Sequence, residues 1–243
     1  LAFDDIRVES PLGRVEAQAT AQLGGADGGW PETVAVQMSL GALSLAEGAV
    51  FDRSVALSGA EAAFQIALEP FQVTLGALTI ADDSLPVTLS GRVAAEADGW
   101  RLALDAGSER VSLDTVLDWW PETQAPGARR WLSENMRGTT LHGATFALRS
   151  ALGQPVALYI DSRVTARSVR LGSALPPLSA AEGHLVIHDN RLGLRLTAAQ
   201  MVPSKGGALE LAGSELVIPD LRAKPSRAEI ALQGAGALTA VLS

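Results

Sequence analysis

Apolar and polar residues alternate one by one in many short runs from one end of this chain to the other. The alternating runs are short, and Gly, Pro, Asn and Asp separate them; they cover residues 3–8, 13–21, 34–45, 64–69, 72–77, 87–90, 101–105, 145–149, 156–161, 164–171, 184–188, 192–197, 209–211, 216–218 and 230–232. A period of two is that of a β-strand with one apolar face and one hydrated face. Within residues 34–45 the alternation changes phase near Gly41, which predicts a β-bulge. The pattern therefore predicts a mainly β fold built from antiparallel strands.

Residues 112–138 are the one stretch with a convincing helical period. Ser112 is a predicted N-cap, and the apolar positions that follow it recur at steps of three and four residues, at Leu113, Val116, Leu117 and Trp120. Pro121 should end this helix, because the residue before a proline is disfavoured in the helical conformation.

A second helix is predicted over about residues 124–137, with Pro126 in its first turn. Arg137 suits the negative end of that helix, and Gly138 could close it in the left-handed conformation. Three of the five Trp residues lie in this insert. We therefore expect it to act as a helical cap on the sheet, with a buried Trp131, through Trp120, Trp131, Leu132 and Met136.

Composition narrows the possible functions. The chain of 243 residues has 47% hydrophobic but only 5% aromatic residues, and no linker or low-complexity segment divides it, so residues 1–243 are predicted to form a single β-sheet module. Its net charge of −8 argues against a nucleic-acid partner. Cys is absent, which excludes disulfides and Cys-bound metals, and there is no run of about 18 or more apolar residues. Because the chain begins with Leu1, we expect it to be a fragment of a longer protein.

The candidates for chemistry are few. His184 and His188 share one strand face beside Asp189, but a metal would need a further ligand, so exposed hairpin histidines are the favoured interpretation. His142 is expected in a turn. The adjacent pairs Asp4-Asp5 and Asp82-Asp83 would point to opposite faces of a strand and do not suit glycoside hydrolysis. Neither a nucleophile elbow nor a phosphate loop is recognisable. The sequence therefore predicts no enzyme activity, no metal site and no cofactor.

One set of segments resembles a known family. The set comprises Trp120-Pro121, Pro126, Ala128-Arg129, Trp131-Leu132, Asn135 and Gly138, followed by residues 175–178, 181–183, 213–220 and 224–225. In this order they resemble AsmA-like envelope proteins of Gram-negative bacteria, and more closely the YhdP-type branch of that family. The resemblance covers the second half of the chain well; in the first half it extends only to the general character of the sequence and not to particular motifs.

The resemblance implies a bacterial bridge-like lipid transfer protein. Such a protein is anchored in the inner membrane by an N-terminal helix, and its periplasmic part is an elongated, curled antiparallel β-sheet, an open trough with an apolar groove. The implied function is phospholipid transport between the inner and outer membranes during outer membrane biogenesis. The implied partners are phospholipid or another acyl lipid, neighbouring segments of the same long chain, and the inner membrane through an anchor that this chain lacks.

Under this hypothesis the apolar strand positions would line the groove. The residues assigned to it are Phe64, Ile66, Leu68, Phe146, Leu148, Val156, Leu158, Ile160, Leu192, Leu194, Leu196, Leu209 and Leu211. If the strands carrying the last five residues pair as a hairpin, those side chains form one patch. Two alternatives stay open: a closed β-sandwich with a structural or interaction role, and a carbohydrate-active enzyme. A single Tyr and five Phe make the enzyme a poor fit.

Overall fold

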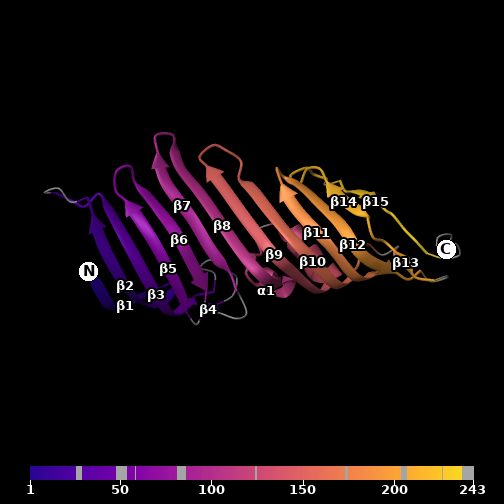
Figure 1. Cartoon of the computed structure of the whole chain (residues 1–243), viewed down its shortest axis with the longest axis horizontal. Coiled ribbons are helices and arrows are strands. Elements are labelled where there is room, and N and C mark those ends of the chain that lie inside the picture. The colour runs from indigo at the N-terminus through magenta and orange to yellow at the C-terminus, as the bar shows by residue number, and fades with distance from the viewer. Residues whose placement is uncertain are drawn as a thin grey trace. The chain divides into compact units, whose positions relative to one another are not determined.

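The computed structural model describes residues 1–25, 29–47, 54–57, 59–80, 86–123, 125–172, 175–203, 207–225 and 227–236. In these ranges the chain forms one open antiparallel sheet of 15 strands and two short helices (Figure 1). The predicted mainly β, antiparallel fold class is therefore confirmed. The chain divides into two compact units: unit 1 comprises Leu1–Ser108 with Phe146–Ala157, and unit 2 comprises Glu109–Thr145 with Leu158–Ser243.

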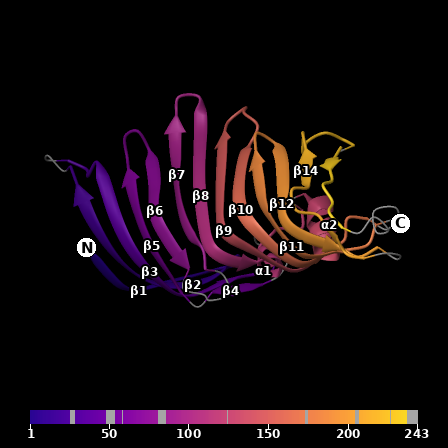
Figure 2. The ribbon, with the colours of Figure 1, turned by 45° about the vertical axis from the view of Figure 1, so that its right-hand side comes forward.

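Neighbouring strands in the sequence are mostly neighbours in the sheet. The order is β1-β2-β3-β5-β6-β7-β8-β9-β10-β11-β12-β14-β15, with β4 paired to β3 and β13 paired to β12. The strands are β1 Ala2–Ser10, β2 Gly13–Gly24, β3 Thr33–Leu45, β4 Val55–Leu57, β5 Ala60–Ala67, β6 Gln72–Ile80, β7 Thr88–Glu96, β8 Gly99–Ser112, β9 Met136–Ala151, β10 Ala157–Val169, β11 Leu178–His188, β12 Arg191–Met201, β13 Leu209–Glu210, β14 Glu215–Ile218 and β15 Glu229–Ala231. Figure 2 shows the strands of unit 1 running side by side.

Bulges correct the phase of the alternation in unit 1. Between the pairs Val15–Leu43 and Ala17–Leu40, β3 has one residue more than β2, which confirms the bulge predicted near Gly41. A second bulge, at Gly76 in β6, was not predicted; it places Ala77 opposite Ala63, away from the face that holds Leu75. A third lies in β1 between Phe3 and Ile6. Each bulge returns the following apolar residues to the face they would otherwise leave.

Strand β10 is longer than the sequence pattern indicated. Residues 157–169 form one strand, whereas the alternation predicted two shorter ones, over 156–161 and 164–171. The polar residue Ser162 hides the continuity, because it stands at an apolar position of the pattern. Ser162 is fully buried, and its hydroxyl donates to the backbone oxygens of His142 and Arg163. A hydroxyl that is bonded in this way can occupy a buried position at low cost.

Unit 2 has a closed hydrophobic core. Its buried members are Ala166, Val169, Leu178, Ala181, Ala199, Met201 and Leu211, and the partly buried Met136, Leu171 and Leu196 pack against them. These residues come from β9, β10, β11, β12 and the segments next to them. A core of this kind buries large aliphatic side chains from several elements at once.

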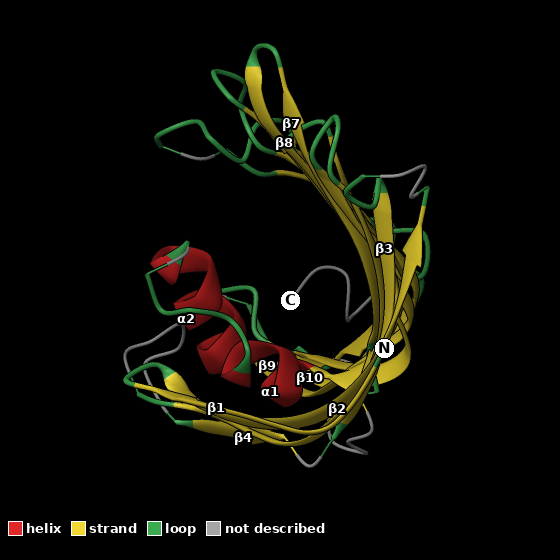
Figure 3. Ribbon diagram, turned by 90° about the vertical axis from the view of Figure 1, so that its left-hand side faces the viewer, coloured by secondary structure: helices red, strands yellow, loops and turns green. Residues whose placement is uncertain are grey.

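The helical insert lies within unit 2. Helix α1 spans Leu113–Asp118 and α2 spans Pro126–Asn135, and Figures 1 and 3 place α1 beside β9 and β10. The predicted cap is confirmed, since the Ser112 hydroxyl accepts a hydrogen bond from the Thr115 backbone N–H at 2.9 Å. Arg129 joins the two helices by donating to the backbone oxygens of Trp120 and Leu117, each at 3.2 Å.

Two details of the predicted second helix are wrong. Helix α2 ends at Asn135, and Met136 is already extended, so Met136 belongs to β9. Gly138 has a left-handed φ of 58°, but it lies within β9, where a Cβ would approach the Cβ of Arg167 to 3.1 Å. Gly138 therefore permits a close approach of two strands and does not close the helix.

The expectation of a buried Trp131 is also wrong. Trp131 is 41% exposed, and no residue of α2 is buried. Trp120 and Leu132 are half-buried. The buried contacts of the insert come instead from Leu113 and Leu117 in α1, while Met136 packs against the unit 2 core from β9.

The N-cap offers a direct test of the helical insert. We expect Ser112→Ala to lower the free energy of unfolding by about 1 kcal/mol, because it leaves the Thr115 N–H without its acceptor. Ser112→Asp should retain most of the stability. Ser133→Ala is the control, since the exposed Ser133 hydroxyl bonds only to the Arg130 oxygen of its own helix. Urea unfolding measures all three variants, and equal losses for Ser112→Ala and Ser133→Ala would contradict the capping role.

Candidate functional site

The strand registers of unit 1 bring its apolar residues to one face. Residues directly opposite each other on antiparallel strands share a face. Val36, for example, lies opposite Ala21 on one side and Phe64 on the other, and Ile66 lies opposite Val34 and Val73. Following the pairs from β1 to β8 defines the unit 1 apolar face: Phe3, Ile6, Val8, Val15, Ala17, Ala19, Ala21, Leu23, Val34, Val36, Met38, Leu40, Ala60, Ala62, Phe64, Ile66, Val73, Leu75, Leu78, Ile80, Leu89, Val93, Ala95, Trp100, Leu102, Leu104 and Ala106.

The opposite face of unit 1 is polar. It carries Arg7, Glu16, Gln18, Thr20, Gln22, Gln37, Ser39, Glu61, Gln65, Gln72, Thr74, Thr79, Thr88, Arg92, Arg101 and Asp105. Ion pairs such as Arg7 Nε–Glu16 Oε1 at 3.3 Å cross between its strands. Arg149 of β9 joins the same face by an ion pair of 2.7 Å to Asp105. Because side chains alternate along a strand, Phe146 and Leu148 point to the apolar face.

Among the described residues of unit 1, no second layer covers the apolar face. The buried residues in the described part of this unit are all small, namely Ala17, Ala19, Ala21, Ala60 and Ala94. Its Leu, Ile, Val and Phe side chains remain partly or largely exposed in the same ranges. In unit 2, by contrast, Leu, Val and Met are buried. Unit 1 therefore presents a broad apolar surface that its own residues do not bury.

The predicted lining residues divide among several places. Phe64, Ile66, Phe146 and Leu148 lie on the unit 1 apolar face, as argued above. Leu68 and Val156 lie in turns at strand ends and are exposed. In unit 2, the strand pairs of β10, β11 and β12 place Ile160, Leu192, Leu194 and Leu196 on one partly buried apolar face with Ile187 and Leu185, and Leu158 shares the side of Ile160. Leu209 lies in the short strand β13, and Leu211 belongs to the unit 2 core.

The strands that carry residues 192–196 and 209–211 do pair, but not at the leucines that the predicted patch requires. Strand β12 pairs with β13 only at Gln200 and Met201, whereas Leu192 and Leu194 lie opposite Ile218 and Leu216 of β14. The two halves of this long strand therefore have different partners. Leu211 belongs to the unit 2 core, where Leu196 alone of the three β12 leucines packs against it. The five side chains do not form one open patch.

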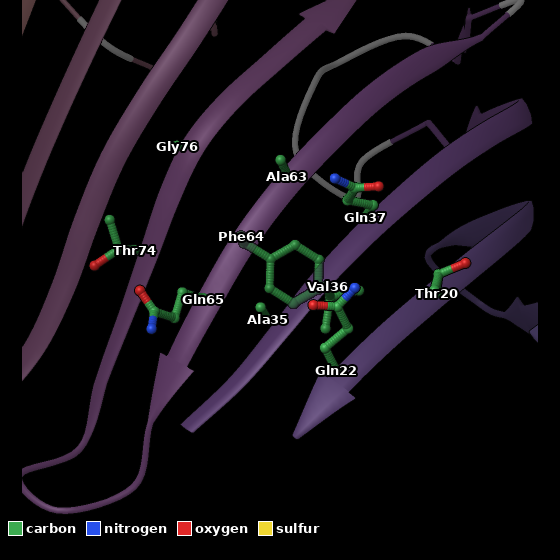
Figure 4. A pocket seen from close by; sticks show the side chains of 10 residues that line it. All are labelled: Thr20, Gln22, Ala35, Val36, Gln37, Ala63, Phe64, Gln65, Thr74 and Gly76. Atoms are coloured by element: carbon green, nitrogen blue, oxygen red, sulfur yellow. The ribbon is translucent and has the colours of Figure 1, made fainter. Parts of the chain in front are cut away.

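A hollow on the polar face was missed by the sequence reasoning. It has a volume of about 290 Å³, and Figure 4 shows its lining on β2, β3, β5 and β6. The small residues Ala35, Ala63 and Gly76 leave the space, and the neutral side chains of Gln22, Gln37, Gln65, Thr20 and Thr74 surround it. Val36 and Phe64, which belong to the apolar face, complete the lining. Glutamine and threonine at alternate positions beside alanine and glycine are the only sequence signal for it. Its lining carries no charged group.

The histidines have separate partners. His184 Nε2 lies 2.9 Å from Asp161 Oδ1, and His188 Nδ1 lies 3.2 Å from Asp189 Oδ2. His142 is in β9 and not in a turn as expected; its Nε2 lies 3.0 Å from the Thr165 hydroxyl. In the described ranges there is no group of three or more His, Cys, Asp or Glu that could hold a metal.

The carboxylate pairs do not form a common site. Asp4 and Asp5 lie at the bulge of the edge strand β1, where both are exposed. Asp82 and Asp83 fall outside the described residues.

Because comparisons with known proteins found no match, the function is argued from the geometry of the described residues. No protein-family model, curated protein or solved structure matches this chain. Among the described helices, none is both long enough and apolar enough to cross a membrane.

A matched pair of leucines tests whether the unit 1 face is uncovered. We expect Leu178→Ala, in the unit 2 core, to cost about 2–5 kcal/mol of stability. Leu102→Ala, on the unit 1 apolar face, should cost about 1 kcal/mol or less, because water already reaches that side chain. Urea unfolding of the two variants measures the difference. Equal costs would mean that Leu102 is packed against a covering layer.

Proposed function

We propose that the unit 1 apolar face binds the acyl chains of phospholipids, and that the chain is a periplasmic segment of a protein that carries phospholipid between the inner and outer membranes. One observation carries this proposal: apolar side chains lie in register from β1 to β8 on a face that the described residues of the unit leave uncovered. The resemblance to AsmA-like proteins supports the lipid and the compartment.

The energetics of burial favour a lipid occupant. Each large apolar side chain left in water forgoes about 1.5–3 kcal/mol, and a bound acyl chain would recover part of that loss. Burial of the acyl chain contributes about 0.8 kcal/mol of binding free energy for each methylene, or roughly 10 kcal/mol for a full lipid tail. The paired positions of the face contain no charged residue, so an acyl chain meets no group that would have to lose its hydration.

The open sheet supports this function over a closed sandwich. A sandwich would bury Leu, Ile and Val between two layers, whereas unit 1 buries alanines alone among its described residues. The polar face, with its Arg, Glu, Gln and Thr side chains, suits contact with water. The proposed role is therefore binding and conduction, and not catalysis.

Neighbouring segments of a longer chain would extend the sheet in this proposal. Among the described strands, β1 is first in the sheet order and pairs with β2 alone, so its other edge could bond to a further strand. An inner-membrane anchor would lie elsewhere in such a protein.

Two aspartates on adjacent positions of β5 test the proposal. Ile66 is on the apolar face and Gln65 is on the polar face of the same strand. Because the apolar face is uncovered, Ile66→Asp should leave the fold largely intact, but it should weaken the binding of a fluorescent fatty-acyl probe by about tenfold or more. Gln65→Asp should change neither property. The probe is used below its micelle concentration, and circular dichroism follows the fold.

The outcomes separate the alternatives. Unfolding caused by Ile66→Asp but not by Gln65→Asp would show a packed core and favour a structural module. Unchanged probe binding in a folded Ile66→Asp variant would remove the lipid function from this face.

A further inference from the structure

The turns at one end of unit 1 carry large apolar side chains. In an antiparallel sheet the turns that follow β2, β5, β7 and β9 lie at the same end, and Figure 1 shows the β5–β6, β7–β8 and β9–β10 turns together at the upper edge. Among the exposed large side chains of these turns and of the strand positions beside them, we name the following six the tip rim: Leu23, Trp30, Leu68, Phe71, Trp100 and Leu152.

Contacts join the tip rim into one continuous feature. The Leu68 N–H donates to the Glu32 oxygen, which links the β5–β6 turn to the β2–β3 connection. The Phe71 and Trp100 rings meet edge to face with their centroids 5.9 Å apart, linking β6 to β8. Next to them, a Cβ placed on Gly99 would lie 2.8 Å from Leu152 Cδ2, so the β7–β8 and β9–β10 turns touch.

The side chains of the tip rim are highly exposed. Trp30 is 89% exposed and Leu152 is 74% exposed. At the opposite end of unit 1, the described β1–β2 turn has one large apolar side chain, Leu12, at 61%. A rim of aliphatic and aromatic side chains that water already reaches suits insertion into a fluid lipid surface. Tryptophan in particular is enriched where an apolar environment meets water at a membrane surface.

The charges beside the tip rim indicate the kind of lipid. The acidic residues Glu32, Glu69, Glu96 and Asp98 lie in the same turns. Arg101 already pairs with Glu96 at 2.6 Å and with Asp98 at 3.2 Å. The balance at this end is negative, which disfavours an anionic surface and permits a zwitterionic one.

From these observations we propose that the tip rim docks unit 1 onto a zwitterionic lipid surface. Leu23 and Trp100 belong both to the tip rim and to the unit 1 apolar face, opposite Val34 and Ala95. Docking therefore places the bilayer directly at the end of that face. The docking does not depend on the apolar face holding lipid, so the two proposals fail independently.

Sedimentation of the full chain with sucrose-loaded vesicles tests the docking. We expect binding to phosphatidylcholine vesicles, and weaker binding when phosphatidylglycerol replaces half of the lipid at low salt. Trp30→Ser combined with Leu152→Ser should weaken binding to phosphatidylcholine by about tenfold or more. Leu12→Ser is the matched control at the other end and should leave binding unchanged. Trp30→Ser alone should give part of the loss, and its side chain is too exposed for its removal to disturb the fold.

Three results would overturn the proposal. They are absence of binding to phosphatidylcholine by the unaltered chain, equal binding by the double variant and Leu12→Ser, and stronger binding to vesicles that contain phosphatidylglycerol. Melting temperatures within the range of the unaltered chain confirm that the variants are folded. The fatty-acyl probe is measured on the same variants and should bind normally, which distinguishes loss of docking from loss of chain binding.

Discussion

This structure depends on one constraint: residues that pair across antiparallel strands lie on the same face of the sheet. With a side-chain period of two, one extra residue in a strand would send every later apolar side chain to the wrong face. The chain contains three such extra residues in unit 1, and each is absorbed by a bulge, in β1, near Gly41 and at Gly76. The apolar face stays continuous because each bulge lies where the alternation of apolar and polar residues changes phase.

The two units use the same strand chemistry in different ways. In unit 2 the ends of β10, β11 and β12, with Met136 and Leu211, close around a core that buries Leu, Val and Met. In unit 1 the described residues bury only alanines, and order comes from the hydrogen-bonded ladder between long strands. Because unit 1 does not depend on a core of large side chains, its apolar surface can stay open to an apolar ligand.

Alternation predicted the fold class and most strands, and local rules predicted the Ser112 cap and the Gly41 bulge. Alternation and local rules failed where residues distant in the sequence decide which strands pair and which side chains are buried. Nothing within β12 indicates that Leu192 pairs with β14 while Met201 pairs with β13. Ser162 disguised the continuity of β10 because one acceptor of its buried hydroxyl, the His142 backbone oxygen, comes from β9, 20 residues away in the sequence. Trp131 was expected to be buried from its size and helical position, but burial depends on what packs against α2. Phe64 and Ile66 were placed on an apolar strand face from sequence alone. That the described residues of unit 1 do not cover this face became visible only in the structure.

Native mass spectrometry of the chain purified from a lipid-rich host tests the central claim most directly. If the unit 1 apolar face holds acyl chains, a fraction of the protein should carry additional mass equal to intact phospholipid, and that mass should be lost on collisional activation. A spectrum that contains only the bare chain, from a preparation in which phospholipid was abundant and the protein folded, would contradict the lipid-binding function.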